Sequence, residues 1–369
     1  MTLSRRSFVA LLGGGTIAAA GGGAAAFAVT RTPHAALAPW DMAGGYADPR
    51  ARALSWALLA PNPHNRQPWT VRMDGDDGMT VWRDPDRDLP VTDPFGRQLT
   101  IGMGCFLELA RMAAAQEGFA TEARLFPDGE GPGDPIAHLR LIDDAAVPDP
   151  LFAHVLDRRS HKEPFRSDPV TPQAAASLTP HCRVHLGGPV HAVLLEQANA
   201  AHLAEAATPA AWQESIDLLR IGKAEIVADP DGIDVGGPML EALARLGVLT
   251  REAASDPNHP AARGSIEATS DAILSAPATT TIVTATNTRL DQIEAGRLWL
   301  RQNLAATGAG LALRPVSQAL QEYAEVRPMH DAVHAAAAPD GGTVQMLGLL
   351  GHGARTARTP RWPLESRMV

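Results

Sequence analysis

Hydrophobic and polar positions follow a helical period in some segments of this chain and a strand-like pattern in others, and the two kinds of segment alternate. Apolar residues that recur every three to four positions predict helices over 49–59, 99–116, 190–206 and 290–307. Alternating or β-branched apolar runs predict strands. These lie at 70–73 and 79–82, as a hairpin around Asp-Gly-Asp-Asp-Gly, and at 120–126, 136–142, 184–186, 279–285, 311–318 (strand and turn) and 344–350. The mixture predicts an α+β fold.

The pattern also contains a weak internal repeat. Residues 99–126 and 290–313 each run from an apolar helix through glycine into a strand. Two similar halves in one chain would form a pseudo-dimer. We place the first half at 49–150 and the second at 151–369.

Two segments depart from this plan. Residues 29–48 contain Pro33, Pro39 and paired glycines, and we interpret them as a linker. Residues 212–268 are irregular, because helical pieces over 212–227 and 239–246 are separated by turns rich in Gly, Pro and Asp. We interpret this second segment as a lid-like insertion.

Residues 1–28 have the features of an export signal. Arg5 and Arg6 precede Phe8, an apolar Gly- and Ala-rich run follows, and Ala26-Phe27-Ala28 is a small-x-small cleavage site. Paired arginines before Phe resemble a twin-arginine signal. This predicts export by the twin-arginine machinery to the periplasm or cell envelope, with membrane contact only through this segment. An uncleaved membrane anchor is the alternative.

Composition excludes several classes of protein. A net charge of -9 and a pI near 5.8 argue against a nucleic-acid partner. The two cysteines, Cys105 and Cys182, form neither a metal motif nor a disulfide framework. The sequence lacks a Gly-x-Ser-x-Gly elbow, a His-Glu-x-x-His motif and a Walker loop, so a hydrolase, a metalloprotease and an ATPase find no support.

Two polar motifs carry the candidate chemistry. Three prolines within residues 61–68 exclude a helix or central strand there, and they fix a loop that carries His, Asn, Arg and Gln. Arg158, Arg159, Ser160 and Lys162 lie within five residues. Guanidinium groups and an ammonium match the oxygens of a doubly charged phosphate. Such a run of charge is equally typical of a solvated turn.

Four motifs together resemble the nitroreductase family. They are Pro-His-Asn-x-Gln-Pro-Trp at 63–69, Arg-Arg-Ser-x-Lys at 158–162, Arg-Gln-Asn-Leu-Ala-Ala-x-Gly-x-Gly-Leu at 301–311 and Leu-Gly-x-x-Gly-His-Gly at 347–353. The proportions are similar to those of its tandem, Acg-type branch. The resemblance implies a nitroreductase-like fold, with two halves in one chain, that binds FMN.

The resemblance also implies roles for individual residues. The basic stretch would hold the FMN phosphate and ribityl chain, and Arg361 would reach the phosphate from the C-terminal segment. The family often has Pro-x-Glu-Gly over the flavin, where this chain has Ser317 and Gln318 after Pro315, which puts the side-chain role in doubt. Trp69, Val316 and the helix over 290–307 could supply an apolar slot for the ring. The cofactor-binding candidates are Asn65, Gln67, Trp69, Arg158, Arg159, Ser160, Lys162, Pro315, Ser317, Gln318, His352 and Arg361.

Two functions follow from the resemblance. The first is an FMN oxidoreductase that passes hydride from NAD(P)H, or another donor, to a nitroaromatic, quinone or similar acceptor. The flavin would carry the chemistry, so no catalytic side chain is expected. The second is an FMN-binding or sequestering protein with little turnover, suggested by the insertion and by the loss of the Glu-Gly pair. The basic stretch occurs once, which predicts one FMN per chain.

Overall fold

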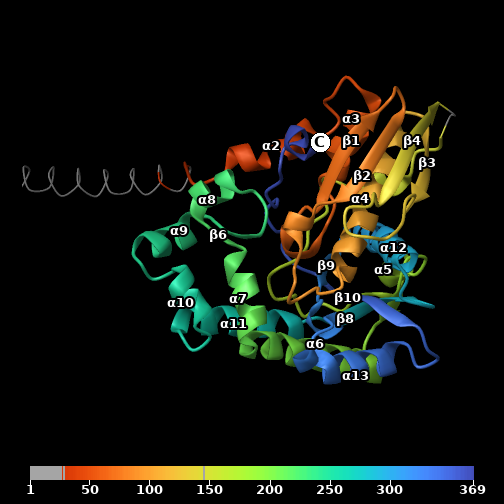
Figure 1. The fold of residues 1–369 in the computed structure, drawn as a ribbon. Coiled ribbons are helices and arrows are strands. Elements are labelled where there is room, and N and C mark those ends of the chain that lie inside the picture. The colour runs from red at the N-terminus through yellow and green to blue at the C-terminus, as the bar shows by residue number, and fades with distance from the viewer. Residues whose placement is uncertain (1–26, 28–29, 144–145) are drawn as a thin grey trace, which may run out of the picture.

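The computed structural model describes residue 27, residues 30–143 and residues 146–369. The twin-arginine motif and the apolar run after it lie outside the described residues. The described chain is a mixed α+β structure built around two four-stranded sheets, with two long helices between them (Figure 1). The predicted α+β class is therefore confirmed.

The first sheet has the strand order β1-β2-β4-β3, and every pairing is antiparallel. The predicted hairpin forms, because Gly75 and Gly78 allow the chain to reverse and Val71 then pairs with Val81. The helix α4 packs beneath the sheet, next to α3. The bounds are α3 (Pro49–Ala57), β1 (Trp69–Asp74), β2 (Gly78–Arg83), α4 (Arg97–Gln116), β3 (Phe119–Leu125) and β4 (Ala137–Asp143).

The second sheet has the order β5-β8-β10-β9 and is also antiparallel. In both sheets, the fourth strand along the chain lies between the second and the third. In both, a helix of 20 residues joins the second strand to the third. The bounds are α5 (Pro172–Ala176), β5 (Arg183–His185), α6 (Gly188–Ala207), β8 (Ala278–Thr284), α12 (Arg289–Gly308), β9 (Ala312–Pro315), α13 (Arg327–Ala337) and β10 (Thr343–Gly351).

Helices α4 and α12 pack closely against each other at a pair of glycines, one on each helix. A Cβ on Gly104 would lie 2.2 Å from the carbonyl oxygen of Ile293, and one on Gly296 would lie 2.0 Å from that of Ile101. The Cys105 thiol donates to the Gly296 carbonyl oxygen over 3.1 Å. Only glycine at both positions allows this approach, which joins the two sheets through one hydrophobic core.

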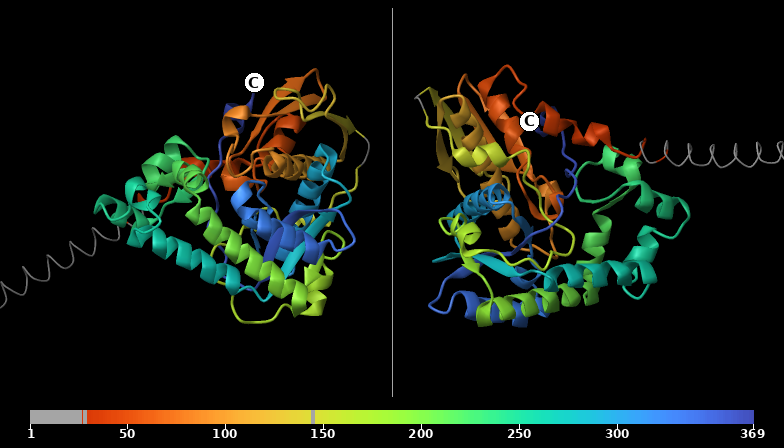
Figure 2. Two further views of the ribbon diagram at one scale, coloured as in Figure 1. Left: turned by 60° about the horizontal axis from the view of Figure 1, so that its bottom comes forward. Right: turned by 180° about the vertical axis from the view of Figure 1, so that it is seen from behind.

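Residues 209–274 form an arm that extends away from both sheets (Figure 2). The helix predicted over 212–227 is wrong as a continuous helix. Residues Leu219–Ile221 form strand β6, which pairs in parallel with β7, and Gly222 has a left-handed φ of +79°. Tertiary pairing overrides the helical pattern there. The bounds are α7 (Pro209–Asp217), β6 (Leu219–Ile221), α8 (Gly222–Ala228), β7 (Ile233–Val235), α9 (Pro238–Arg245), α10 (Arg251–Ser255) and α11 (Pro260–Leu274).

The arm is held to the first half by a buried carboxylate. Asp231 is 2% exposed and pairs with Arg66 over 2.6 Å, with Arg220 over 2.8 Å and also with Arg87. Two of these arginines belong to the first half and one to the arm. The arm is therefore fixed where its β7 segment meets the loop that contains Arg66.

The predicted linker is not unstructured, because its residues His34–Met42 form helix α2. Pro39 lies inside this helix, and Ala36 and Trp40 are buried against the rest of the protein. The C-terminal segment passes beside α2, since the Arg361 backbone N–H donates to the Ala36 carbonyl oxygen over 2.8 Å. Both ends of the described chain thus meet near α2 (Figure 1).

Candidate functional site

Two adjoining cavities form a cleft to which both halves contribute. Their volumes are about 200 and about 190 Å³. The loop before β1, the end of β9 and the basic stretch each contribute residues to both cavities. The residues common to the two cavities are Pro61, Asn62, His64, Ser160 and Pro315.

The proline-fixed loop has an unusual backbone. His64, Asn65 and Gln67 have φ values of +46°, +53° and +49°, in the left-handed region that residues with a Cβ rarely adopt. The Asn62 carboxamide oxygen accepts from the Gln67 backbone N–H over 2.7 Å and stabilises this turn. Strain of this kind concentrates at functional sites. It brings His64 and Asn65 to the cleft.

The first cavity ends in two buried arginines. Arg158 is 4% exposed, and its guanidinium donates to the Leu59 carbonyl oxygen over 2.9 Å. Arg361 is 3% exposed and donates to the carbonyl oxygen of Leu58 and the side-chain oxygen of Asn65. Within the described part of the chain, no Asp or Glu forms an ion pair with either arginine.

Burial without a counterion has an electrostatic cost. Desolvation lowers the pKa of Arg158 to about 10, and desolvation together with the charge of Arg158 lowers that of Arg361 to about 9. Arg159 lines the same cavity, and its pKa is lowered to about 10 by desolvation and by neighbouring arginines. An unneutralised cationic pocket of this kind attracts a multiply charged anion.

Lys162 lies at the same end but has a partner. Its ammonium group contacts a carboxylate oxygen of Asp234 over 2.9 Å, and about half of its side chain is exposed. Asp234 belongs to β7 of the arm, and Gly232 and Ile233 line the cavity beside it. The predicted insertion therefore contributes a wall and a carboxylate to the cationic cavity.

The second cavity is largely apolar. Ile101, Cys105, Trp299 and Met346 line it, and Gln98, Ser317 and Gln318 add polar groups. Burial raises the pKa of Cys105 to about 12, so this thiol is neutral and packs as an apolar group. The cleft thus has a cationic end and an apolar end, joined at Ser160 and Pro315.

The structure brings together most of the predicted site residues and leaves three outside. Gln67 is fully buried, donates to the Pro230 carbonyl oxygen over 2.7 Å and accepts from the Trp362 backbone N–H. Trp69 stacks on Phe106 in the core. His352 accepts through its carbonyl oxygen from the Arg166 N–H. The residues that line the cleft are Asn65, Arg158, Arg159, Ser160, Lys162, Pro315, Ser317, Gln318 and Arg361.

The corrections have simple causes. Trp69 opens strand β1 with its side chain on the core face, and Val316 is likewise buried in the core. Of the three predicted contributors to the apolar slot, α12 is the one that lines the cleft, through Trp299. Trp40, His64 and Asp234 were not among the predicted cofactor-binding residues. Trp40 was missed because Pro33 and Pro39 beside it indicated a linker.

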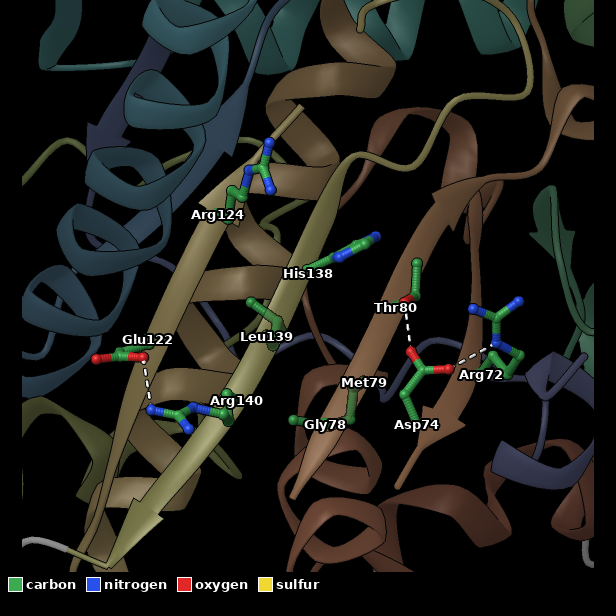
Figure 3. A pocket seen from close by; sticks show the side chains of 10 residues that line it. All are labelled: Arg72, Asp74, Gly78, Met79, Thr80, Glu122, Arg124, His138, Leu139 and Arg140. Carbon is green, nitrogen blue, oxygen red and sulfur yellow. Dashed lines mark hydrogen bonds and ion pairs between the residues drawn. The ribbon is translucent and has the colours of Figure 1, made fainter. Parts of the chain in front are cut away.

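A larger hollow, of about 420 Å³, lies on the outer face of the first sheet (Figure 3). Two of its arginines pair with carboxylates, and a third, Arg124, donates to the Pro127 carbonyl oxygen. Arg140 contacts Glu122 over 3.1 Å, and Arg72 contacts Asp74 over 2.7 Å. Because these charges are already satisfied and exposed, the hollow is the solvated face of an antiparallel sheet.

In residues 30–143 and 146–369, no group of three or more His, Cys, Asp or Glu side chains is arranged to hold a metal ion. Among the helices of these residues, none is long and apolar enough to cross a membrane.

The chain is similar in sequence to proteins named as nitroreductases and distantly similar in structure to a solved nitroreductase, and no family model matches the chain. The chain is 30% identical over 307 residues to the protein named "Putative NAD(P)H nitroreductase Rv3131" of Mycobacterium tuberculosis, covering 80% of this chain and 82% of that protein. "Putative NAD(P)H nitroreductase acg" of the same organism is 33% identical over 123 residues, 32% of this chain and 36% of that protein. The crystal structure of the FMN-dependent nitroreductase NfnB from Mycobacterium smegmatis in complex with NADPH has a TM-score of 0.36 and 17% identity, covering 58% of this chain and 96% of that one.

Proposed function

This chain belongs to the nitroreductase family, and on that premise we propose that it is an FMN-dependent oxidoreductase. NAD(P)H or another donor would supply hydride, and a nitroaromatic, a quinone or a similar compound would accept it. The observation that carries the proposal is the pair of buried arginines, Arg158 and Arg361, which lack a carboxylate partner within the described residues.

The residues of the cationic end fit a phosphate monoester. Arg158 and Arg159 offer guanidinium donors, Arg361 adds its positive charge, and Ser160 lines both this cavity and the apolar one. A dianion there would offset the charge that burial leaves uncompensated. Lys162 would add a further positive charge at the mouth of the cavity, where it now pairs with Asp234.

The residues of the apolar end fit a flat aromatic ring. Trp299, Ile101 and Met346 provide apolar walls, and Gln318 and Ser317 provide polar groups at the edge. Bound FMN would accept hydride from the donor and pass it to the acceptor. The side chains of this end would orient the ring and exclude water.

We also propose that the two sheets belong to two nitroreductase-like halves, so that the chain is a pseudo-dimer. The shared strand order and the matching positions of α4 and α12 support this. Because the basic stretch occurs once and both halves line one cleft, one FMN per chain follows.

For the N-terminal region we propose export through the twin-arginine machinery to the periplasm or cell envelope. The support is the Arg5-Arg6 pair, the apolar run and the small-x-small site. Membrane contact would involve only that segment. A fractionation experiment with Arg5 and Arg6 both replaced by lysine tests this, because the variant should stay in the cytoplasm.

Mixing the FMN-loaded protein with NADPH under anaerobic conditions tests the redox function. The flavin absorbance near 450 nm should bleach within seconds and return when a quinone is added. Bound FMN that keeps its absorbance with both NADH and NADPH, but loses it with dithionite, would contradict hydride transfer from NAD(P)H.

A second function, FMN sequestration with little turnover, is favoured by one observation. The β7 segment of the arm lines the cationic cavity, and Asp231 fixes it there through three arginines. The same stopped-flow experiment separates the two functions. Slow reduction in the wild type that becomes fast in Asp231→Asn would favour sequestration.

A further inference from the structure

The N-terminal residues 30–42 lie against the cationic end of the cleft, although their prolines suggested a linker. Trp40, near the end of α2, is 2% exposed and lines the cationic cavity. Its indole N–H donates to the Thr359 carbonyl oxygen over 2.8 Å. This bond fixes the ring plane against the C-terminal segment that carries Arg361.

The Trp40 ring is a shared platform for three arginines. The guanidinium carbon of Arg159 lies 4.7 Å from the ring centroid, that of Arg358 lies 5.4 Å away, and that of Arg361 lies 5.7 Å away. Arg159 belongs to the basic stretch, Arg358 and Arg361 belong to the C-terminal segment, and the three cations repel one another. The electron-rich face of an indole ring attracts each of them.

An aromatic ring and a carboxylate differ in how much of an arginine's charge and how many of its N–H donors they leave free for another ligand. A carboxylate among these arginines would neutralise them and occupy their hydrogen-bond donors. A ring face attracts the cations without taking their N–H groups. Arg358 pairs with Asp41, and the Arg361 guanidinium donates to backbone oxygens and to Asn65. Among these three arginines, the donors left for an incoming anion therefore belong to Arg159, while Arg361 contributes its charge. The Arg159 Nε atom is in fact buried without a hydrogen-bond partner.

Contacts on both sides fasten this N-terminal segment. Arg358 pairs with Asp41 over 2.6 Å, and the Arg361 backbone N–H donates to Ala36. At its other end, Arg31 pairs with Glu241 of the arm over 2.6 Å. The segment therefore runs as a strap from the arm to the cationic cavity.

We infer that Trp40 is a positioning residue for the phosphate of FMN, and that the strap of residues 30–42 completes the phosphate end of the cleft. The inference rests on the proposed function, because it takes FMN as the ligand. It adds that recognition of the phosphate depends on a segment N-terminal to both sheets. Riboflavin, which lacks the phosphate, should bind almost independently of Trp40.

The test compares FMN and riboflavin in four proteins: wild type, Trp40→Phe, Trp40→Leu and Trp82→Leu. Trp82 is the matched control, because it also lies under one arginine, Arg72, at 5.0 Å, but on the outer face of the first sheet. Flavin fluorescence quenching gives the two dissociation constants. Trp40→Leu should weaken FMN binding by roughly 10-fold or more relative to riboflavin, whereas Trp40→Phe keeps most of the preference. Trp82→Leu should leave the ratio unchanged.

Equal losses for FMN and riboflavin in Trp40→Leu, or no loss, would overturn the inference while the FMN assignment stands. A wild-type chain that binds neither flavin would refute the proposed function and this inference with it. If Trp40→Leu does not fold, limited proteolysis of the wild type tests whether residues 30–42 respond to the phosphate of FMN. FMN should slow cleavage within residues 30–42 and riboflavin should not; equal protection by both would refute the role of the phosphate.

Discussion

Replacing Arg158 with methionine should stabilise the FMN-free protein and lower its affinity for FMN. The guanidinium is buried, and desolvation lowers its pKa by more than two pH units, to about 10. At about 1.4 kcal/mol for each pH unit, this corresponds to about 3 kcal/mol of disfavoured charge. The penalty is fully present at pH 7, because it is relieved only as the pH rises above the folded-state pKa.

The hydrogen bond lost in Arg158→Met offsets part of this gain. It joins the guanidinium to the Leu59 carbonyl oxygen over 2.9 Å, and such a bond contributes about 1 kcal/mol. The Leu59 oxygen keeps a second donor, Arg361, at 3.4 Å. We therefore expect the free energy of unfolding without FMN to rise by about 2 kcal/mol, measured by urea denaturation at pH 7.

The effect on FMN has the opposite sign. A charge-assisted hydrogen bond to phosphate contributes about 1.5–3 kcal/mol, so Arg158→Met should weaken FMN binding by roughly 10- to 100-fold. Fluorescence quenching at fixed ionic strength measures it. Riboflavin binding should change little, because riboflavin makes no phosphate contact.

Arg124→Met is the matched control for both measurements. Arg124 also donates to one backbone carbonyl, that of Pro127 over 3.1 Å, but its side chain is exposed on the first sheet. Neither the stability nor the FMN affinity should change in this variant. If Arg158→Met loses stability without FMN, or keeps full FMN affinity, the argument from the uncompensated buried charge is wrong.

Three further predictions concern residues outside the cleft that hold the fold together. Asp231→Asn should lower the free energy of unfolding by about 3–5 kcal/mol and expose the arm to proteolysis, because three arginines lose one buried partner. The control Asp168→Asn changes an exposed ion pair and should lower the free energy of unfolding by at most about 1 kcal/mol. Gly104→Ala should lower the urea midpoint, because the added methyl group forces α4 away from α12 and reduces the free energy of unfolding by about 1–3 kcal/mol. Gly264→Ala, where the new methyl group meets open space on α11, should raise the midpoint slightly. Burial raises the pKa of Glu205 to about 7, so the contribution of this residue to stability should be greatest below its unfolded-state pKa of about 4.5. That contribution should fall by up to about 3 kcal/mol as the pH rises from there through 7. Glu205→Gln should remove that fall in urea titrations from pH 4 to 8, and an unchanged pH profile would contradict it.

Local patterns were enough to predict the main elements. The period of apolar residues predicted α4 and α12 to within a few residues, and the Asp-Gly turn predicted the first hairpin. The two polar motifs, one fixed by prolines and one basic, do meet at one cleft. Backbone restriction and charge density are properties of short segments, so the sequence alone carried them.

The parts that were not predicted depend on contacts between distant segments. Trp69 and Trp40 look alike in sequence, yet the first stacks on Phe106 in the core and the second lies under three arginines. Strand β6 forms because β7 pairs with it, against a local helical pattern. Asp234 reaches Lys162 only because the arm folds back onto the cleft. No local periodicity encodes these approaches.

A calorimetric titration with FMN and then with riboflavin tests the central claim most directly. The claim is that one cleft, built from both halves, holds one FMN by its phosphate. The account predicts one FMN per chain and riboflavin binding weaker by roughly 100-fold or more, since several charge-assisted bonds are lost. Two FMN per chain, equal affinity for the two flavins, or no binding of either would contradict it.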